Sequence, residues 1–278
     1  MENKILQLNN LTNGLHFLSL GGIGEIGANC YLYGCDGKWI MIDLGLSFAD
    51  EKFPGVDLLV PKIDHIDSIQ DNLEAIIISH GHEDHAGAVA FFANKIKCPV
   101  YATKFAKLLI ENRLKEFNKN EGFVLKELSL DEELILNNFK LNFIPTTHSI
   151  PEPSAIVIQT SYGSLLHTAD WKIDKSPTLG NSFSTNEFEK IGNEGLLALI
   201  GDSTNANVPG TSKSENDVRE ELTKIFSRFS NRIVVTCFSS NIARMKNIIY
   251  AAKKNKRKVA LVGRLSLIHI SEPTRPLI

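Results

Sequence analysis

The sequence predicts an α/β protein in two parts: a layered, strand-rich α+β domain up to about residue 205, and after it the start of an α/β unit. Three observations lead to this prediction. Short runs of β-favouring residues dominate the first third of the chain. The nearly continuous apolar run 73–79 is typical of a strand that is covered on both faces. After residue 201 the pattern changes to alternating helix and strand, which indicates a second domain.

The individual elements follow from hydrophobic periodicity and from the turn residues between them. Strands are predicted at 15–20, 29–33, 39–42, 73–79, 99–101, 139–144, 155–159, 164–168, 196–201, 233–237 and 258–262. Helices are predicted at 86–92, 104–117, 214–229 and 242–252. In the third of these helices, Val218, Leu222 and Phe226 share one face at helical spacing.

Composition excludes several classes of protein. The 30 Lys and Arg residues nearly balance the 32 Asp and Glu residues, so any surface for a polyanion must be a local patch. The basic run 253–258 could contact phosphates, but we favour its interpretation as a solvated helix end, and the substrate-binding residues are unknown. We expect no membrane span and a cytoplasmic location, because no apolar run is long enough and the N-terminus does not resemble a signal peptide. The four cysteines form no CxxC pair and are expected in the core.

The last fourteen residues, 265–278, lack helical and strand periodicity. Through Arg275 they resemble the translation of an adapter used in sequencing libraries. We therefore expect a non-native tail on a chain that is truncated after residue 264.

A glycine-rich run, Gly22-Ile23-Gly24-Glu25-Ile26-Gly27, matches the G-x-G-x-x-G pattern of dinucleotide-binding proteins. That function requires a helix to begin at the third glycine, because the phosphates rest on its N-terminus. The residues that follow, 29–33, favour a β-strand instead. The run is therefore interpreted as the turn of a hairpin.

The segment His80-Gly81-His82-Glu83-Asp84-His85 places three histidines and an aspartate within six positions, between a predicted strand and a predicted helix. Imidazole nitrogen and carboxylate oxygen suit zinc, manganese and iron. Residues two apart in such a loop can face one ion, while the following Asp-His pair faces a second. The segment therefore predicts a metal site.

Further residues of ligand type follow other predicted strands. Asp43, His148 and Asp170 each come after the end of one of these strands. Each residue alone is explained as well by a role in a cap or turn. Together they indicate a site assembled at one edge of a sheet sandwich.

Asp43, the run His80 to His85, His148 and Asp170 resemble, in order, the signature motifs of the metallo-β-lactamase superfamily. The resemblance implies an αββα sandwich and a hydrolytic site with two divalent metal ions. Zinc is the expected metal, and Mn²⁺ or Mg²⁺ are alternatives. It further implies the following roles: His80, His82 and His148 hold one metal, Asp84 and His85 hold the second, Asp170 bridges, and Asp43 orients a ligand histidine.

Two later segments resemble the β-CASP group within that superfamily: Asp202-Ser203-Thr204-Asn205 and the junction 236–244. Together with 21–29, 43–48 and 167–174 they resemble the ribonuclease J family, over essentially all of 12–264. The implied domains are a metallo-β-lactamase domain at 1–205 and the start of a β-CASP domain at 206–264. The implied activity is zinc-dependent hydrolysis of RNA, as a 5′-to-3′ exonuclease with endonuclease activity, in RNA maturation and decay.

The resemblance also implies RNA as the substrate, a homodimer or homotetramer of the full-length parent, and a role for Asp202 in orienting a proton donor. The family's later histidine motifs have no counterpart here, so we expect the chain as given to be inactive. The alternative is a hydrolase of the same fold that acts on a thioester, lactone or β-lactam. That alternative explains the histidines equally well but leaves 202–205 unexplained.

Overall fold

A computed structural model of the chain describes residues 8–49, 51, 53–119 and 122–262. The chain divides into two compact units. The first takes in the chain up to Thr146, together with 152–171 and 184–206, and the second takes in 147–151, 172–183 and the chain from Asn207 onward. The domain limits 1–205 and 206–264 remain predictions, and the predicted tail 265–278 lies outside the described residues.

A six-stranded sheet in the first unit has the order β1-β2-β3-β6-β7-β8. Its strands are β1 (Leu15–Gly21), β2 (Cys30–Cys35), β3 (Lys38–Ile42), β6 (Leu73–Ile78), β7 (Val100–Ala102) and β8 (Leu125–Glu127). Strands β1 to β3 pair antiparallel, whereas β3, β6, β7 and β8 pair parallel. Because β3 and β6 run in the same direction, Asp43 and Ser79, which follow them, lie at the same edge of this sheet.

A five-stranded sheet in the same unit has the order β13-β12-β11-β10-β9. Its strands are β9 (Leu134–Leu136), β10 (Phe139–Pro145), β11 (Ser154–Thr160), β12 (Gly163–His167) and β13 (Ala198–Ile200). Strands β10 and β12 both pair antiparallel with β11, and β13 pairs parallel with β12. The carboxyl ends of β10, β12 and β13 therefore lie at one edge of the sheet.

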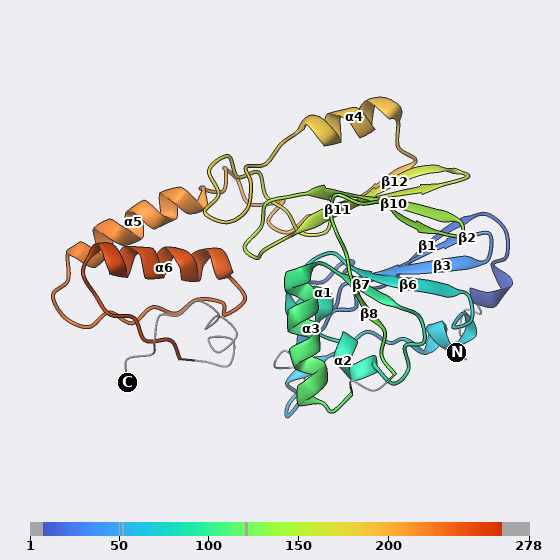
Figure 1. Ribbon diagram of the computed structural model, residues 1–278, viewed down its shortest axis with the longest axis horizontal. Helices are drawn as coiled ribbons and strands as arrows, with labels where there is room; N and C mark the ends of the chain where they lie inside the picture. The colour runs from blue at the N-terminus through green and yellow to red at the C-terminus, as the bar shows by residue number, and fades with distance from the viewer. Residues whose placement is uncertain (1–7, 50, 52, 120–121, 263–278) are drawn as a thin grey trace. The chain divides into compact units, whose positions relative to one another are not determined.

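The two sheets pack face to face through a buried apolar cluster (Figure 1). In this cluster Ile40 and Ile77 of the first sheet are in contact with a layer that contains Leu141, Ile156 and Ile158 of the second. All five side chains are fully buried. Burial of such side chains supplies most of the free energy that holds the two sheets together.

Helices cover the outer face of each sheet (Figure 1). On the six-stranded sheet lie α1 (Glu83–Ala86), α2 (Val89–Phe92) and α3 (Lys104–Glu116), packed through a second apolar cluster. On the five-stranded sheet lies α4 (Asn186–Glu194), which packs Phe188 and Ile191 against buried residues of β10, β11 and β12. The predicted αββα sandwich is confirmed.

Short elements complete the first unit: the 3₁₀ helices η1 (Leu8–Asn10) and η2 (Asp64–Ser68) and the two-stranded sheet of β4 (Ser47–Phe48) and β5 (Leu58–Leu59). The glycine-rich run lies in the connection between β1 and β2, which pair antiparallel. No helix follows its third glycine; β2 begins at Cys30. The hairpin prediction is therefore confirmed, and the arrangement lacks the helix that dinucleotide binding requires.

The second unit contains α5 (Glu215–Ser227) and α6 (Ile242–Lys254), which pack through Phe226, Ala251 and Ala252. Ser214 caps α5 in a capping box with Asp217, and the Asn241 side chain caps α6. Such caps satisfy backbone N–H groups that have no partner inside the helix.

Three predictions about elements and one about a cysteine need correction. In place of one helix at 86–92, the chain forms the two short helices α1 and α2. The helix is interrupted because the N–H of Ala88 donates to the Leu44 carbonyl. In a continuous helix it would donate to the Asp84 carbonyl, which here accepts the N–H of Asn29. The strands at 233–237 and 258–262 are absent: both segments are described as irregular, and no described strand pairs with either. An apolar run that has no neighbouring strand to hydrogen-bond with gains too little stabilising free energy to form a strand itself. Cys237, in the first of these segments, is accordingly exposed rather than in the core.

Within the described part of the chain, no helix combines the length and the apolar character that a membrane crossing needs.

Because the core lies between the two sheets, we expect two isoleucines of the first unit to differ greatly in how much stability is lost when each is replaced by alanine. Ile40 is fully buried, whereas Ile135 on β9 is 71% exposed. Ile40→Ala should lower the free energy of unfolding by about 2–5 kcal/mol, and Ile135→Ala by less than about 0.5 kcal/mol. Urea denaturation checks both, and equal losses would contradict the described packing.

Candidate metal centre

The candidate centre in the first unit is built from residues that follow strand ends. Ser79 and His80 come directly after β6, and His82, Asp84 and His85 come from the turn into α1 and from α1 itself. His80 and His85 are almost fully buried, and His82 is 9% exposed. Asp170 follows β12 at the edge of the facing sheet.

A buried carboxylate, that of Asp43, holds this segment in place. Its Oδ1 accepts the backbone N–H of Ser79 at 2.7 Å, and its Oδ2 accepts the Ser79 hydroxyl at 2.8 Å. His85 Nδ1 also donates to Oδ2, at 2.7 Å. Because Asp43 keeps a proton on Nδ1, Nε2 is the nitrogen of His85 that can give up its proton and bind a metal.

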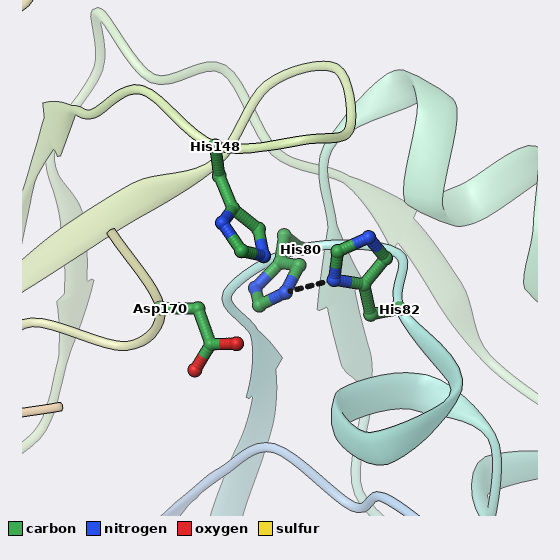
Figure 2. Close-up of side chains that lie close together, drawn as sticks. All are labelled: His80, His82, His148 and Asp170. Atoms are coloured by element: carbon green, nitrogen blue, oxygen red, sulfur yellow. Dashed lines mark hydrogen bonds between the residues drawn. The ribbon is translucent and has the colours of Figure 1, made fainter. Parts of the chain in front are cut away.

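His80, His82 and Asp170 form the first group of ligand atoms. One ligand atom from each lies within 4.8 Å of the others. His80 Nε2 is 3.1 Å from His82 Nδ1, and the two rings meet edge-on (Figure 2). Two imidazole nitrogens and a carboxylate oxygen at this spacing match the donors that zinc takes in proteins.

Asp84, His85 and Asp170 form the second group, again within 4.8 Å of one another. His85 Nε2 lies 3.2 Å from an Asp170 oxygen and 3.6 Å from an Asp84 oxygen. Asp170 is thus the residue common to both groups, as expected of a carboxylate that bridges two metals.

The electrostatics of the second group favour a cation. Burial raises the pKa of Asp84, and the neighbouring Asp170 and Asp43 carboxylates raise it further. Burial opposes protonation of His85, but Asp43 and Asp170 outweigh it and raise the pKa of His85 well above its ordinary value. Three carboxylates around one imidazole form a site where positive charge is stabilised. The donor set and its charge therefore fit a metal ion of the kind that nitrogen and oxygen ligands bind.

His148 lies on the loop 147–151, which belongs to the second unit. The loop leaves β10 after Thr146 and returns to β11, and the Thr146 N–H donates to the Pro153 carbonyl. Figure 2 draws His148 with the three residues of the first group.

Asp202 follows β13 in the first unit and is linked to the strand beside it. Its backbone N–H donates to Thr168 Oγ1 at 3.0 Å, two residues before Asp170. Its carboxylate accepts the N–H of Thr204 at 2.7 Å. The second contact is one that a turn-forming aspartate makes, so the geometry alone assigns no chemical role to this side chain.

The sequence did not indicate Ser79, whose N–H and O–H both donate to Asp43. A serine beside a histidine motif carries no signal of its own, because its role depends on the carboxylate of Asp43, which follows a different strand, β3. His167, the last residue of β12, is buried, and its Nδ1 shares a hydrogen bond with the Tyr33 hydroxyl at 2.9 Å. Burial lowers the pKa of His167 to about 4.

Comparison with known families gives two matches. The model of the metallo-β-lactamase superfamily matches residues 23–182. The model of the ribonuclease J β-CASP domain matches residues 230–274.

Two curated relatives are similar over most of this chain. Ribonuclease J2 of Bacillus subtilis (strain 168) is 36% identical over 253 residues, which are 91% of this chain and 46% of that protein. Ribonuclease J of Sinorhizobium meliloti is 41% identical over 254 residues, which are 90% of this chain and 45% of that protein. The chain thus spans about half the length of the curated relatives it matches.

A solved structure from Enterococcus faecalis V583, of a protein of unknown function, superposes with a TM-score of 0.59 at 17% identity. The match covers 90% of this chain and 71% of that one. It supports the fold alone.

The depressed pKa of His167 predicts a pH dependence of stability. An unfolded histidine takes up a proton below about pH 6.5, whereas folded His167 stays neutral down to about pH 4. The contribution of this neutral histidine is therefore fully present above pH 6.5 and declines as the pH falls towards 4.

The measurement is the free energy of unfolding of metal-free wild type and His167→Asn from pH 7 to pH 4. The advantage of wild type over the variant should shrink with falling pH, by at most about 1.4 kcal/mol per pH unit. A pH-independent difference would show that His167 titrates normally in the folded state.

Proposed function

The chain belongs to the metallo-β-lactamase superfamily and, within it, to the ribonuclease J family, and from this premise we propose that the protein is a metal-dependent ribonuclease. The proposed reaction is hydrolysis of RNA phosphodiester bonds. We propose 5′-to-3′ exonuclease action with endonuclease activity, in RNA maturation and decay.

One observation supports the hydrolytic part of this proposal most strongly: two groups of ligand atoms share Asp170 at the edge of the sandwich. Two bound divalent cations would polarise the phosphate and make a hydroxide nucleophile available near neutral pH. Support for RNA as the substrate comes from the β-CASP match and from the two relatives, which are both named ribonucleases.

The residues of this chain have distinct proposed roles. His80, His82 and His148 would hold one metal, Asp84 and His85 the second, and Asp170 would contact both. Zinc is the proposed metal, because this donor set is rich in imidazole. Asp43 keeps the proton of His85 on Nδ1, so that Nε2 is free to bind. Asp202, at the end of β13, would orient a proton donor.

The experiment that tests the proposal offers two substrates to the product of the complete reading frame: 5′-phosphorylated single-stranded RNA and a thioester. The proposal expects zinc-dependent release of nucleotides from RNA and no comparable turnover of the thioester. Turnover of the thioester without cleavage of RNA would contradict it. The 278-residue chain, assayed in parallel, tests the expectation that it is inactive on its own.

Because the ligand atoms form two groups, substitution of a ligand in either group should reduce the amount of bound metal. His82→Ala removes a donor from the first group and Asp84→Ala from the second. Each variant should hold less zinc per chain than wild type after dialysis, measured by mass spectrometry of the metal, and should abolish RNA cleavage by the complete protein.

His16→Ala is the matched control. His16 lies on β1, where its Nε2 contacts the Asn13 carbonyl at 2.8 Å and its ring stacks on Trp39. Its removal should leave the zinc content unchanged. Full zinc content in His82→Ala would refute the assignment of that ligand.

A further inference from the structure

The glycine-rich connection between β1 and β2 has no part in the reaction proposed above, yet it ends beside the second ligand group. Its last residue, Asn29, precedes β2. The Asn29 N–H donates to the Asp84 carbonyl, and the Asn29 carbonyl accepts the N–H of Gly45, both at 2.9 Å. The backbone of Asn29 is thereby fixed between two segments that come from other parts of the sequence.

The close approach of these segments requires glycine at position 45. A Cβ atom on Gly45 would lie 1.7 Å from the Asp84 carbonyl oxygen, which no rearrangement of a side chain could relieve. The contact of Asn29 with the α1 segment is therefore a rigid feature of the backbone. It does not depend on the Asn29 side chain.

The side chain of Asn29 has its own support. The Tyr31 hydroxyl donates to Asn29 Oδ1 at 2.8 Å, which leaves the Nδ2 amide group on the opposite side. Tyr31 is 7% exposed, and burial raises the pKa of its hydroxyl, so that the proton needed for this bond is retained. The orientation of the carboxamide is thus set by Tyr31.

Gly22 makes room for this pair. Its φ is +84°, and a Cβ there would lie 2.3 Å from Tyr31 Oη and 2.5 Å from Asn29 Oδ1. One glycine of the motif is therefore required because the backbone passes directly over the hydrogen bond between Tyr31 and Asn29.

Asn29 Nδ2 is directed at the second ligand group. It lies 3.0 Å from His85 Nε2 and 3.5 Å from Asp84 Oδ2. Asp43, Asp84 and Asp170 place three carboxylates around this imidazole. When His85 Nε2 binds a metal its lone pair is no longer available, and Asp84 Oδ2 is then the acceptor left for the Asn29 amide.

We propose that Asn29, held by Tyr31 and Gly22, is a positioning residue of the second metal site: its Nδ2 donates to the Asp84 carboxylate and orients it as a ligand. Donors of this kind around a ligand tune metal affinity. The inference rests on the proposed function only in taking Asp84 and His85 as ligands of that site. It also gives the glycine motif a role that a simple hairpin turn would not have.

The test is a titration of the metal-free 278-residue chain with zinc alone, in competition with a chelator of known affinity. The second site is identified as the affinity that Asp84→Ala abolishes. In Asn29→Ala this affinity should fall by about 10- to 100-fold, while the affinity of the other site is unchanged. Tyr31→Phe should weaken the same site in the same direction and to a smaller extent.

Two matched controls come from the same unit. Asn142→Ala removes an amide that donates to Glu133, and Tyr162→Phe removes a hydroxyl that donates to Asp36. Both should leave the two zinc affinities unchanged. Asn29→Ala keeps both backbone hydrogen bonds of residue 29, so its metal-free form should still unfold in one cooperative transition, with a thermal midpoint lowered only by the loss of the Tyr31 hydrogen bond.

Unchanged affinity of the second site in both Asn29→Ala and Tyr31→Phe would overturn the inference, as would an equal loss at both sites. Tyr31→Phe removes a single oxygen and keeps the test decisive if Asn29→Ala folds poorly. The readout contains no RNA. If the product of the complete reading frame failed to cleave RNA while the 278-residue chain showed the selective zinc effect, the proposed function would be refuted and this inference would stand.

Discussion

The arrangement of the candidate metal centre depends on one buried carboxylate, that of Asp43. Asp43 is held at a positive φ of 61°, a conformation that costs a residue with a side chain about 1–3 kcal/mol. Three hydrogen bonds, two from Ser79 and one from His85, stabilise it there. Because Ser79 starts the loop after β6 and His85 lies in α1, a single side chain fixes both ends of the histidine segment. The same contact sets the tautomer of His85, so packing and metal chemistry are determined by one group.

Strand direction explains why ligand-type residues gather where they do. Strands β3 and β6 are parallel, and β10, β12 and β13 also share a direction, so their carboxyl ends form two edges. Chain leaving these edges carries Asp43 and His80 from one sheet and Asp170 and Asp202 from the other. Loops at such edges are free to carry polar side chains, while the strands behind them are buried and rigid. Asp170 belongs to both ligand groups, which makes the two groups one centre.

Much of this could be predicted from the sequence, because the determining signals are local. The apolar run 73–79 and the histidines after it identify a buried strand and its loop, and the resemblance to the metallo-β-lactamase superfamily implies the sandwich. The strands at 233–237 and 258–262 were predicted wrongly. A strand needs a neighbouring strand to hydrogen-bond with, and the hydrophobic pattern of a segment does not show whether such a neighbour is present. Helix α4 was missed because it buries no residue completely and carries only two core-facing side chains, Phe188 and Ile191. The contacts of Asn29 with Asp84 and His85 join residues 55 and 56 positions apart, which no local pattern encodes.

We propose that two metal ions bind side by side at this centre and share Asp170. A crystal structure of the zinc-loaded protein, with anomalous diffraction measured at the zinc edge, would show how many ions bind and which residues they contact. We expect two anomalous peaks about 3.5–4 Å apart, one contacting His80 and His82 and the other contacting Asp84 and His85, with an Asp170 oxygen close to each. A single peak, or two peaks of which one does not contact Asp170, would contradict this arrangement.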